Sequence, residues 1–364
     1  MAKSPTAGEA SSPTRRNVLK GAATVALGAL ALPCAAPLAA YAKRKSGIYL
    51  RGVALAGAEF GQLVPGQVDR DYFYPTAADF RFCRAQAFNT VRLPFRWERL
   101  QPDLNAPFDP QEWGLLKSAI RNAREFGLKL ILDPHNYAHR RVRDDDFTVD
   151  HLIGSPAVPS SAFSAFWSQL AKRTAKDAHV IYGIMNEPEG LSADAWLDTA
   201  NEAIAAIRRQ NTGTLLLVPG TAYSGAHSWI AAGNTALARV RDSAGNFAIE
   251  VHQYLDADSS GTSGAVVSET IGVERLQNFQ AWARAQKFKA FLGEFGAASD
   301  AASLAAMSAM LREVERNSDV WIGWTAWATG AHWPQTEPFR LAPGTDGVVP
   351  PQTKFLASLA RAAR

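Results

Sequence analysis

The stretch VIYGIMNEPEG (residues 180–190) is apolar as far as Met185 and then reaches Asn186 and Glu187. A short apolar run with β-branched residues is typical of a strand that is buried on both faces of a parallel sheet. Burying a carboxylate at the end of such a strand costs several kcal/mol unless the carboxylate has a partner. The stretch therefore predicts a parallel α/β fold with a functional group at the carboxyl end of a strand.

Seven further runs have the same character, and the segments between them show the spacing of amphipathic helices. One of these, DPQEWGLLKSAIRNAREFG, has Asp109 as a helix cap, Pro110 in the first turn and Gly127 at the end. Eight strand–helix units over roughly 300 residues predict a single closed (β/α)8 barrel, the TIM barrel. An open doubly wound sheet is the alternative, but no glycine-rich phosphate loop follows an early strand. The expected strands are 48–53, 89–93, 128–133, 180–185, 214–218, 247–251, 289–292 and 320–325.

The first 42 residues read as a targeting segment. Two adjacent arginines, Arg15 and Arg16, precede an apolar stretch over residues 21–38, and Ala40-Tyr41-Ala42 provides a cleavage site. This pattern resembles a twin-arginine export signal, which implies the twin-arginine export machinery as a partner. A membrane anchor fits less well, because two prolines interrupt a segment that is short for a span. We therefore expect a signal peptide at 1–42, a catalytic domain at 43–364 without a membrane anchor, and a periplasmic or extracellular location.

Composition excludes several classes of protein. The chain has 364 residues, of which 47% are hydrophobic and 20% are charged, as in a globular protein with a large core. Removing residues 1–42 takes away four basic residues and one acidic residue, so the formal net charge falls from +4 to +1. A nucleic-acid partner is therefore not expected. Cys83 would be the only thiol left, so disulfides cannot stabilise the mature chain, and we expect a monomer.

Polar and aromatic residues follow six of the expected strands. In a (β/α)8 barrel the carboxyl ends of the strands form the active site. A single histidine or arginine at such a place is more often structural, but two carboxylates on the fourth and seventh strands are hard to explain by packing. The candidates are Arg92, His135, Asn136, Asn186, Glu187, His252, Tyr254, Glu294 and Trp327.

Five motifs on successive expected strands match one known family. RLPFRW, DPHNY, GIMNEP, VHQYLD and GEFG, in this order, resemble the family 5 glycoside hydrolases, retaining cellulase-type enzymes with a (β/α)8 fold. The loop VHQYLDADSSGTSG is most similar to the endo-β-1,4-glucanase group of that family. The resemblance implies a cellulase that hydrolyses internal β-1,4-glucosidic bonds, and it covers nearly the whole chain after residue 42.

The resemblance also implies a role for each matching residue. Retaining glycosidases use two carboxyl groups that flank the glycosidic bond. Glu294 would be the nucleophile, kept ionised by Arg92 and Tyr254. Glu187 would be the acid and then the base, and it should hold its proton to higher pH.

The remaining matches would bind the sugar. Asn186 is expected to bond the 2-hydroxyl group, and Trp327 should lie under the ring at the cleavage subsite. His135 and His252 would contact sugar hydroxyls or the carboxylates, and Asn136 would be a supporting residue of the substrate-binding site. Trp97 after the second strand and Trp333 after the eighth are expected to be further sugar platforms.

Other readings stay open at this point. The same fold and carboxylates could act on β-mannan, xyloglucan or mixed-linkage glucan, because subsite shape decides the sugar. A metal-dependent barrel hydrolase would use His135, His139 and His252, but the first strand lacks the histidine pair such sites usually have. A non-catalytic sugar-binding barrel would not need both carboxylates. We expect no metal and no cofactor.

Overall fold

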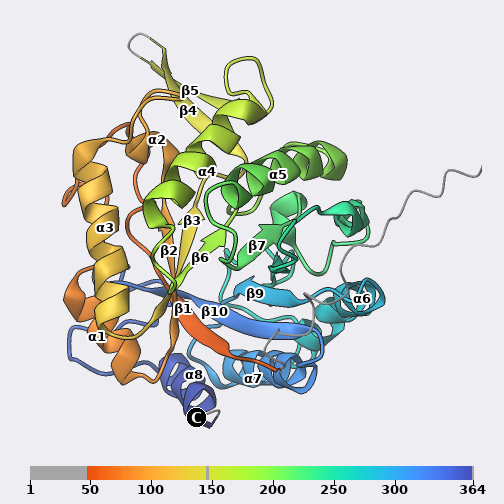
Figure 1. Cartoon of the computed structure of the whole chain (residues 1–364). Coiled ribbons are helices and arrows are strands. Elements are labelled where there is room, and N and C mark those ends of the chain that lie inside the picture. The colour runs from red at the N-terminus through yellow and green to blue at the C-terminus, as the bar shows by residue number, and fades with distance from the viewer. Residues whose placement is uncertain (1–46, 145–146, 363–364) are drawn as a thin grey trace, which may run out of the picture. The chain divides into compact units, whose positions relative to one another are not determined.

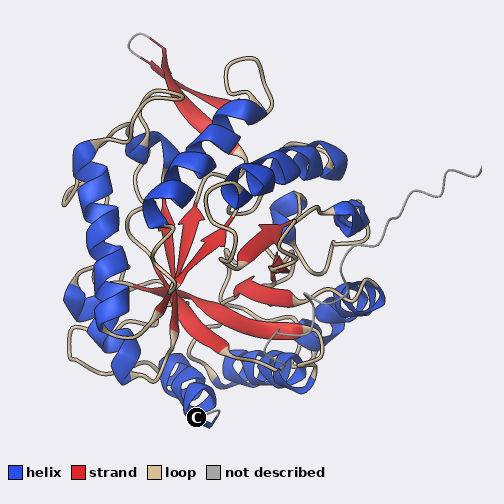
Figure 2. Ribbon diagram, viewed as in Figure 1, coloured by secondary structure: helices blue, strands red, loops and turns tan. Residues whose placement is uncertain are grey.

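The computed structural model describes residues 47–144 and 147–362, and the expected signal peptide at 1–42 lies outside the described residues. The described residues belong to one compact unit that spans Ala40–Arg364. Within them, eight parallel strands close into a barrel in the order β1-β10-β9-β8-β7-β6-β3-β2, and β2 pairs with β1 (Figures 1 and 2). The expected (β/α)8 fold is confirmed, and every expected strand is present.

The barrel strands are short, as is usual for this fold. They are β1 Leu50–Leu55, β2 Thr90–Phe95, β3 Lys129–Pro134, β6 Val180–Gly183, β7 Leu216–Pro219, β8 Phe247–His252, β9 Ala290–Glu294 and β10 Trp321–Thr329. Helices surround them, as Figure 2 shows. These are α1 Ala77–Ala85, α2 Trp97–Leu100, α3 Pro110–Glu125, α4 Ser160–Thr174, α5 Ala193–Arg208, α6 Ile271–Ala285, α7 Ala301–Arg316 and α8 Pro351–Ala362.

The helix ends follow the sequence signals. Asp109 caps α3, where its carboxylate accepts hydrogen bonds from the backbone N–H groups of Gln111 and Glu112. Gly127, two residues after α3, has a φ of +66°, which suits glycine because it lacks a Cβ. Ser192 caps α5 in the same way, through the N–H of Ala195. These local signals fix where α3 and α5 begin, whereas α4 and α6 begin without a hydrogen bond to a capping side chain.

Two features of the fold were not expected from the sequence. The insertion after the third barrel strand contains an antiparallel hairpin, β4 His139–Asp144 with β5 Phe147–Leu152, which rises from the rim in Figure 1. In the described part of the chain, the connection from β7 to β8 has two 3-10 segments, η2 Ala222–Ser224 and η3 Asn234–Arg239, in place of an α-helix. Both features lie beyond the carboxyl ends of strands, where they can border the site.

The barrel interior is built in layers, because every second residue of a strand points inward. The lowest layer is apolar and takes one residue from each of seven strands: Leu50, Ile131, Ile181, Leu217, Ala248, Phe291 and Ile322. Two residues further along β3 and β8 come Asp133 and Glu250, and two further again come His135 and His252. The apolar layer therefore closes the bottom of the barrel, and charged groups occupy its upper half.

Candidate active site

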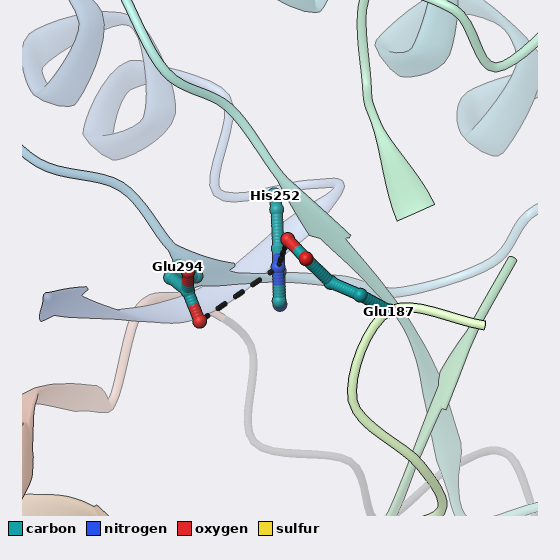
Figure 3. Close-up of side chains that lie close together, drawn as sticks. All are labelled: Glu187, His252 and Glu294. Atoms are coloured by element: carbon teal, nitrogen blue, oxygen red, sulfur yellow. Dashed lines mark hydrogen bonds and ion pairs between the residues drawn. The ribbon is translucent and has the colours of Figure 1, made fainter. Parts of the chain in front are cut away.

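The two predicted catalytic carboxylates lie together at the carboxyl ends of the strands. One carboxylate oxygen of Glu187 lies within 4.8 Å of one carboxylate oxygen of Glu294, and both lie within that distance of a ring nitrogen of His252 (Figure 3). The Glu187 side chain is 15% exposed and that of Glu294 is 9% exposed. Two carboxylates this close inside a protein interior disfavour the doubly ionised state unless cations lie beside them.

Glu294 has the two partners expected for a nucleophile. Arg92 Nη1 donates to its Oε2 at 2.9 Å, and the Tyr254 hydroxyl donates to its Oε1 at 2.7 Å. Both donors fix the orientation of the carboxyl group, and Arg92 places a positive charge beside it. The same guanidinium donates from Nη2 to Asn186 Oδ1 at 2.6 Å. One arginine thus orients both the nucleophile and the neighbouring amide.

Asn186 and Glu187 follow β6 in a tight turn. Glu187 has a φ of +42°, a left-handed conformation that few residues other than glycine adopt. Backbone hydrogen bonds from Asn186 N to Pro134 O at 2.9 Å and from Tyr137 N to Asn186 O at 3.0 Å hold the turn against β3. The Asn186 Nδ2 donor is buried and has no partner among the described residues, so it is available to an acceptor in the cleft.

His252 lies between the two carboxylates. Its Nδ1 is 2.6 Å from Glu187 Oε1 and 3.9 Å from Glu294 Oε2 (Figure 3). Burial alone would lower the pKa of His252, but the carboxylates of Glu294 and Glu187 outweigh burial and raise that pKa to about 10. His252 is therefore an imidazolium at neutral pH, and it contacts the carboxylates, which is one of the two expectations for it.

His135 has a different partner set and a different charge. Its Nδ1 donates to Asp133 Oδ2 at 2.9 Å, and its Nε2 accepts from the Tyr137 hydroxyl at 3.2 Å. Burial lowers the pKa of His135 despite the opposing effect of Asp133. The ring stacks against Trp327 with centroids 5.4 Å apart, so a neutral imidazole and an indole lie side by side at the edge of the cleft.

The tryptophans divide into two groups. Trp327 and Trp333 are both half-buried and meet edge to face with ring centroids 5.7 Å apart, and Phe60 lies 5.7 Å from Trp333. Together they form an aromatic wall at the ends of β1 and β10. Their roles as sugar platforms stay predictions.

Trp97 is not a sugar platform, and that prediction is wrong. Its side chain is fully buried, its ring packs against Phe163 and Phe166 of α4, and its indole N–H donates to Gln101. Asn136 accepts from the Trp97 backbone N–H at 2.9 Å. Asn136 is thus a support that fixes the start of α2, and it also lines a cavity of about 400 Å³ bordered by Tyr137, Glu189 and Tyr223.

The metal reading receives no support from the geometry. In the described part of the chain, Glu187, His252 and Glu294 form the one group of three with the spacing of metal ligands. That group contains neither His135 nor His139, whose Nδ1 lies 2.8 Å from the carbonyl of Tyr137 at the start of the hairpin. The guanidinium of Arg92, which donates to Glu294, supplies the positive charge at this group.

The sequence reasoning missed two buried carboxylates. Asp133 and Glu250 are each 1% exposed, and both face Arg92. Asp133 Oδ2 lies 3.1 Å from Arg92 Nη2, and Glu250 Oε1 lies 3.5 Å from Arg92 Nε. Arg92 and His135 hold the pKa of Asp133 below its usual value although burial opposes this. Both residues stand two positions before a histidine on a strand, and that i, i+2 spacing could have revealed them.

Comparison with known proteins shows the family to which a chain with this fold and this pair of carboxylates belongs. The family model described as cellulase, glycosyl hydrolase family 5, matches residues 53–330. The chain is 34% identical over 285 residues to the endoglucanase gh5-1 of Neurospora crassa, covering 78% of this chain and 70% of the relative. It is 32% identical over 308 residues to the endo-β-1,4-glucanase B of Emericella nidulans, covering 84% and 89%.

Solved structures agree with these relatives. An endo-β-1,4-glucanase from Xanthomonas axonopodis pv. citri is 43% identical with a TM-score of 0.81, covering 86% of this chain and 99% of the other. XacCel5A, solved in complex with cellopentaose, is 44% identical with the same TM-score, covering 85% and 99%. The chain therefore belongs to the glycosyl hydrolase family 5 cellulases.

Proposed function

We propose that the protein is a retaining endo-β-1,4-glucanase that cleaves internal bonds of β-glucan by double displacement. The observation that carries this is the separation of the two carboxylates, with oxygens of Glu187 and Glu294 within 4.8 Å. Retaining glycosidases have carboxyl groups about 5–5.5 Å apart, whereas inverting enzymes leave about 6.5–9.5 Å for a water molecule. The close pair favours direct attack by a carboxylate.

In the first step Glu294 attacks the anomeric carbon and Glu187 gives its proton to the departing glycosidic oxygen. Arg92 and Tyr254 hold the nucleophile in place through its two oxygens. The free Nδ2 of Asn186 would donate to the sugar 2-hydroxyl, a contact that strengthens as charge develops on the ring. The first step ends with a glycosyl group covalently bound to Glu294.

In the second step Glu187, now ionised, removes a proton from water, and the water oxygen attacks the same carbon and releases Glu294. His252 donates to Glu187 at 2.6 Å, so it stabilises the ionised base between the two steps. Two inversions at one carbon give net retention of configuration.

Relatives support β-1,4-glucan as the substrate. Similar proteins are named endoglucanase or endo-β-1,4-glucanase, and the XacCel5A structure holds cellopentaose. Initial rates on carboxymethylcellulose, glucomannan and xyloglucan test the substrate class. High activity on mannan with none on the cellulosic polymer would contradict the proposal.

Substitution tests the assigned roles. Glu187→Gln and Glu294→Gln should each keep the fold and remove most turnover, by at least roughly a thousandfold. Azide should restore activity to Glu294→Ala with a glycosyl azide of inverted configuration as product, and NMR of wild-type products should show retention. Near-normal activity of either glutamine variant would exclude the role assigned to that residue.

Export rests on the sequence alone. The paired arginines and apolar stretch in residues 1–42 support a twin-arginine signal, a partner in the export machinery and a periplasmic or extracellular location. In the described residues no helix is long and apolar enough to cross a membrane. Replacing Arg15 and Arg16 by lysine should block export of active enzyme, and unchanged export would contradict this assignment.

A further inference from the structure

Glu250 is a buried carboxylate that the double-displacement mechanism does not use. It lies on β8 two residues before His252, with 1% of its surface exposed. Its Oε1 is 3.7 Å from His252 Nε2 and 3.5 Å from Arg92 Nε. Neither Glu250 Oε1 nor Arg92 Nε has a hydrogen-bond partner among the described residues, so these contacts act through charge.

The fold reserves space for this carboxylate beneath the nucleophile. A Cβ atom on Gly293, the residue before Glu294, would lie 2.1 Å from Glu250 Oε1. Gly183 on β6 faces the other oxygen, which would be 3.7 Å from a Cβ there. The barrel interior therefore has room for a glutamate at position 250 because β9, which pairs with β8, and β6, two strands away on the other side, both carry glycine where the carboxylate lies.

The charges around His252 come from five segments of the chain. They are Arg92 on β2, Asp133 on β3, Glu187 after β6, Glu250 on β8 and Glu294 on β9, with His135, Tyr137 and Tyr254 as the uncharged titratable neighbours. Four carboxylates thus face one arginine and one imidazolium. With all four ionised, negative charge exceeds positive charge by two, so an additional proton in the cluster is favoured.

His252 links the acid/base to Glu250. Its Nδ1 donates to Glu187 at 2.6 Å, and its Nε2 faces Glu250, so the ring stands between two carboxylates on opposite edges. Groups coupled this closely titrate as a set. A negative charge on Glu250 raises the proton affinity of the whole set, and Glu187 is the member that must give its proton to the substrate.

We propose that Glu250 is a positioning residue that acts through His252 and sets how firmly the acid Glu187 holds its catalytic proton. It touches no substrate, because it lies one layer below the catalytic groups. The proposal rests on the function proposed above, in which Glu187 is the acid.

The pH dependence of kcat/KM on a soluble cello-oligosaccharide tests this. Removing the charge with Glu250→Gln should move the alkaline limb of the profile to lower pH by roughly one unit. Activity above the wild-type alkaline midpoint should fall roughly tenfold, while activity on the acidic side changes much less. Glu250→Asp keeps the charge and should restore most of the alkaline limb.

A matched control separates this effect from a loss of packing. Glu112 is another buried carboxylate, on α3, and it accepts hydrogen bonds from Tyr72 and Tyr74 away from the barrel centre. Glu112→Gln should leave the pH profile in place even if it lowers the thermal midpoint. A Glu250→Gln enzyme whose activity falls equally at every pH, or a Glu250→Asp enzyme with the same shift as Glu250→Gln, would overturn the proposal.

A second measurement needs no variant at position 250. NMR of the histidine ring nitrogens in the wild-type enzyme should find His252 doubly protonated above pH 8, and a neutral ring there would overturn the proposal. Loss of turnover in Glu187→Gln with an unmoved alkaline limb in Glu250→Gln would refute this inference alone. Retention of turnover in Glu187→Gln would instead refute the proposed function.

Discussion

Replacing Glu59 by glutamine should stabilise the protein, and the gain should grow with pH. Glu59 lies in the loop after β1, 5% exposed, where its Oε2 accepts from Gly57 N at 2.7 Å and its Oε1 has no partner among the described residues. Burial raises the pKa of Glu59 from 4.5 to about 8, although hydrogen bonds from the backbone and the charge of Arg96 oppose this.

The direction in which pH changes the free energy of unfolding follows from the number of protons bound to the folded and the unfolded chain. Between pH 4.5 and 8 the unfolded chain loses the Glu59 proton while the folded chain keeps it, so rising pH favours unfolding over this interval. Each pH unit in that window lowers the free energy of unfolding by about 1.4 kcal/mol, which gives at most about 3–4 kcal/mol by pH 7. Glutamine has nearly the same shape, can still accept from Gly57, and does not titrate.

Urea unfolding of the wild type and Glu59→Gln at a series of pH values measures this difference directly. The difference in free energy of unfolding should be small near pH 4, increase up to about pH 8 and then stay constant. Glu125→Gln, on the exposed face of α3, controls for the loss of one carboxylate. A difference between wild type and Glu59→Gln that does not change with pH would refute the reasoning.

Four further substitutions test the site and the residues that support it. Trp97→Ala should lower the free energy of unfolding by about 3–5 kcal/mol in urea titrations, because it empties a fully buried position. Trp327→Ala should instead raise KM with little effect on stability. Tyr254→Phe removes one of two donors to Glu294 and should lower kcat roughly tenfold to a hundredfold in steady-state assays, with the fold intact in circular dichroism. Tyr223 is 54% exposed, and its backbone N–H donates to the carbonyl of Pro188, the residue after Glu187, so its ring should contact the sugars on the leaving-group side. Tyr223→Ala should therefore slow the hydrolysis of cellopentaose several-fold more than the hydrolysis of an aryl cellobioside.

Three of these predictions have a clear contradicting result. A Trp97→Ala enzyme with normal stability and raised KM would restore the sugar-platform reading of that residue. Full activity of Tyr254→Phe would mean that Arg92 alone suffices to orient the nucleophile. Equal slowing of both substrates by Tyr223→Ala would place Tyr223 outside the leaving-group side.

The sequence predicted the barrel because its signals are local and repeated. Each strand is a short apolar run, and each helix has an apolar stripe, with caps such as Asp109 and Ser192, so eight weak signals support one another. The hairpin β4–β5 was missed because HRRVRD has one apolar residue and FTVDHL alternates between apolar and polar residues only over its first four positions. Among the described side chains of the hairpin, Val142 and Leu152 pack against the core, and two such contacts do not require the pattern of a half-buried sheet.

Site residues were predicted correctly where their position along a strand determines the direction of the side chain. They were predicted wrongly where that direction depends on tertiary contacts. Glu294 ends β9, Glu187 follows the end of β6 by four residues, and the two carboxylates meet, as expected from the family motifs. Trp97 also follows a strand, but the chain turns into α2 there and the ring packs under α4, which depends on tertiary contacts that no local pattern encodes. Glu250 was not predicted because it lies within β8, one layer below the strand ends at which catalytic residues are expected.

The shared arginine limits how this enzyme could be engineered. Arg92 donates from Nη1 to Glu294 and from Nη2 to Asn186, and the planar guanidinium keeps these two nitrogens at a fixed spacing. A substitution that shifts the nucleophile to change its reactivity will therefore also shift the amide that would bind the sugar 2-hydroxyl. Rate and sugar preference at the cleavage subsite are mechanically coupled, so changes of specificity are better sought at the aromatic wall of Phe60, Trp327 and Trp333.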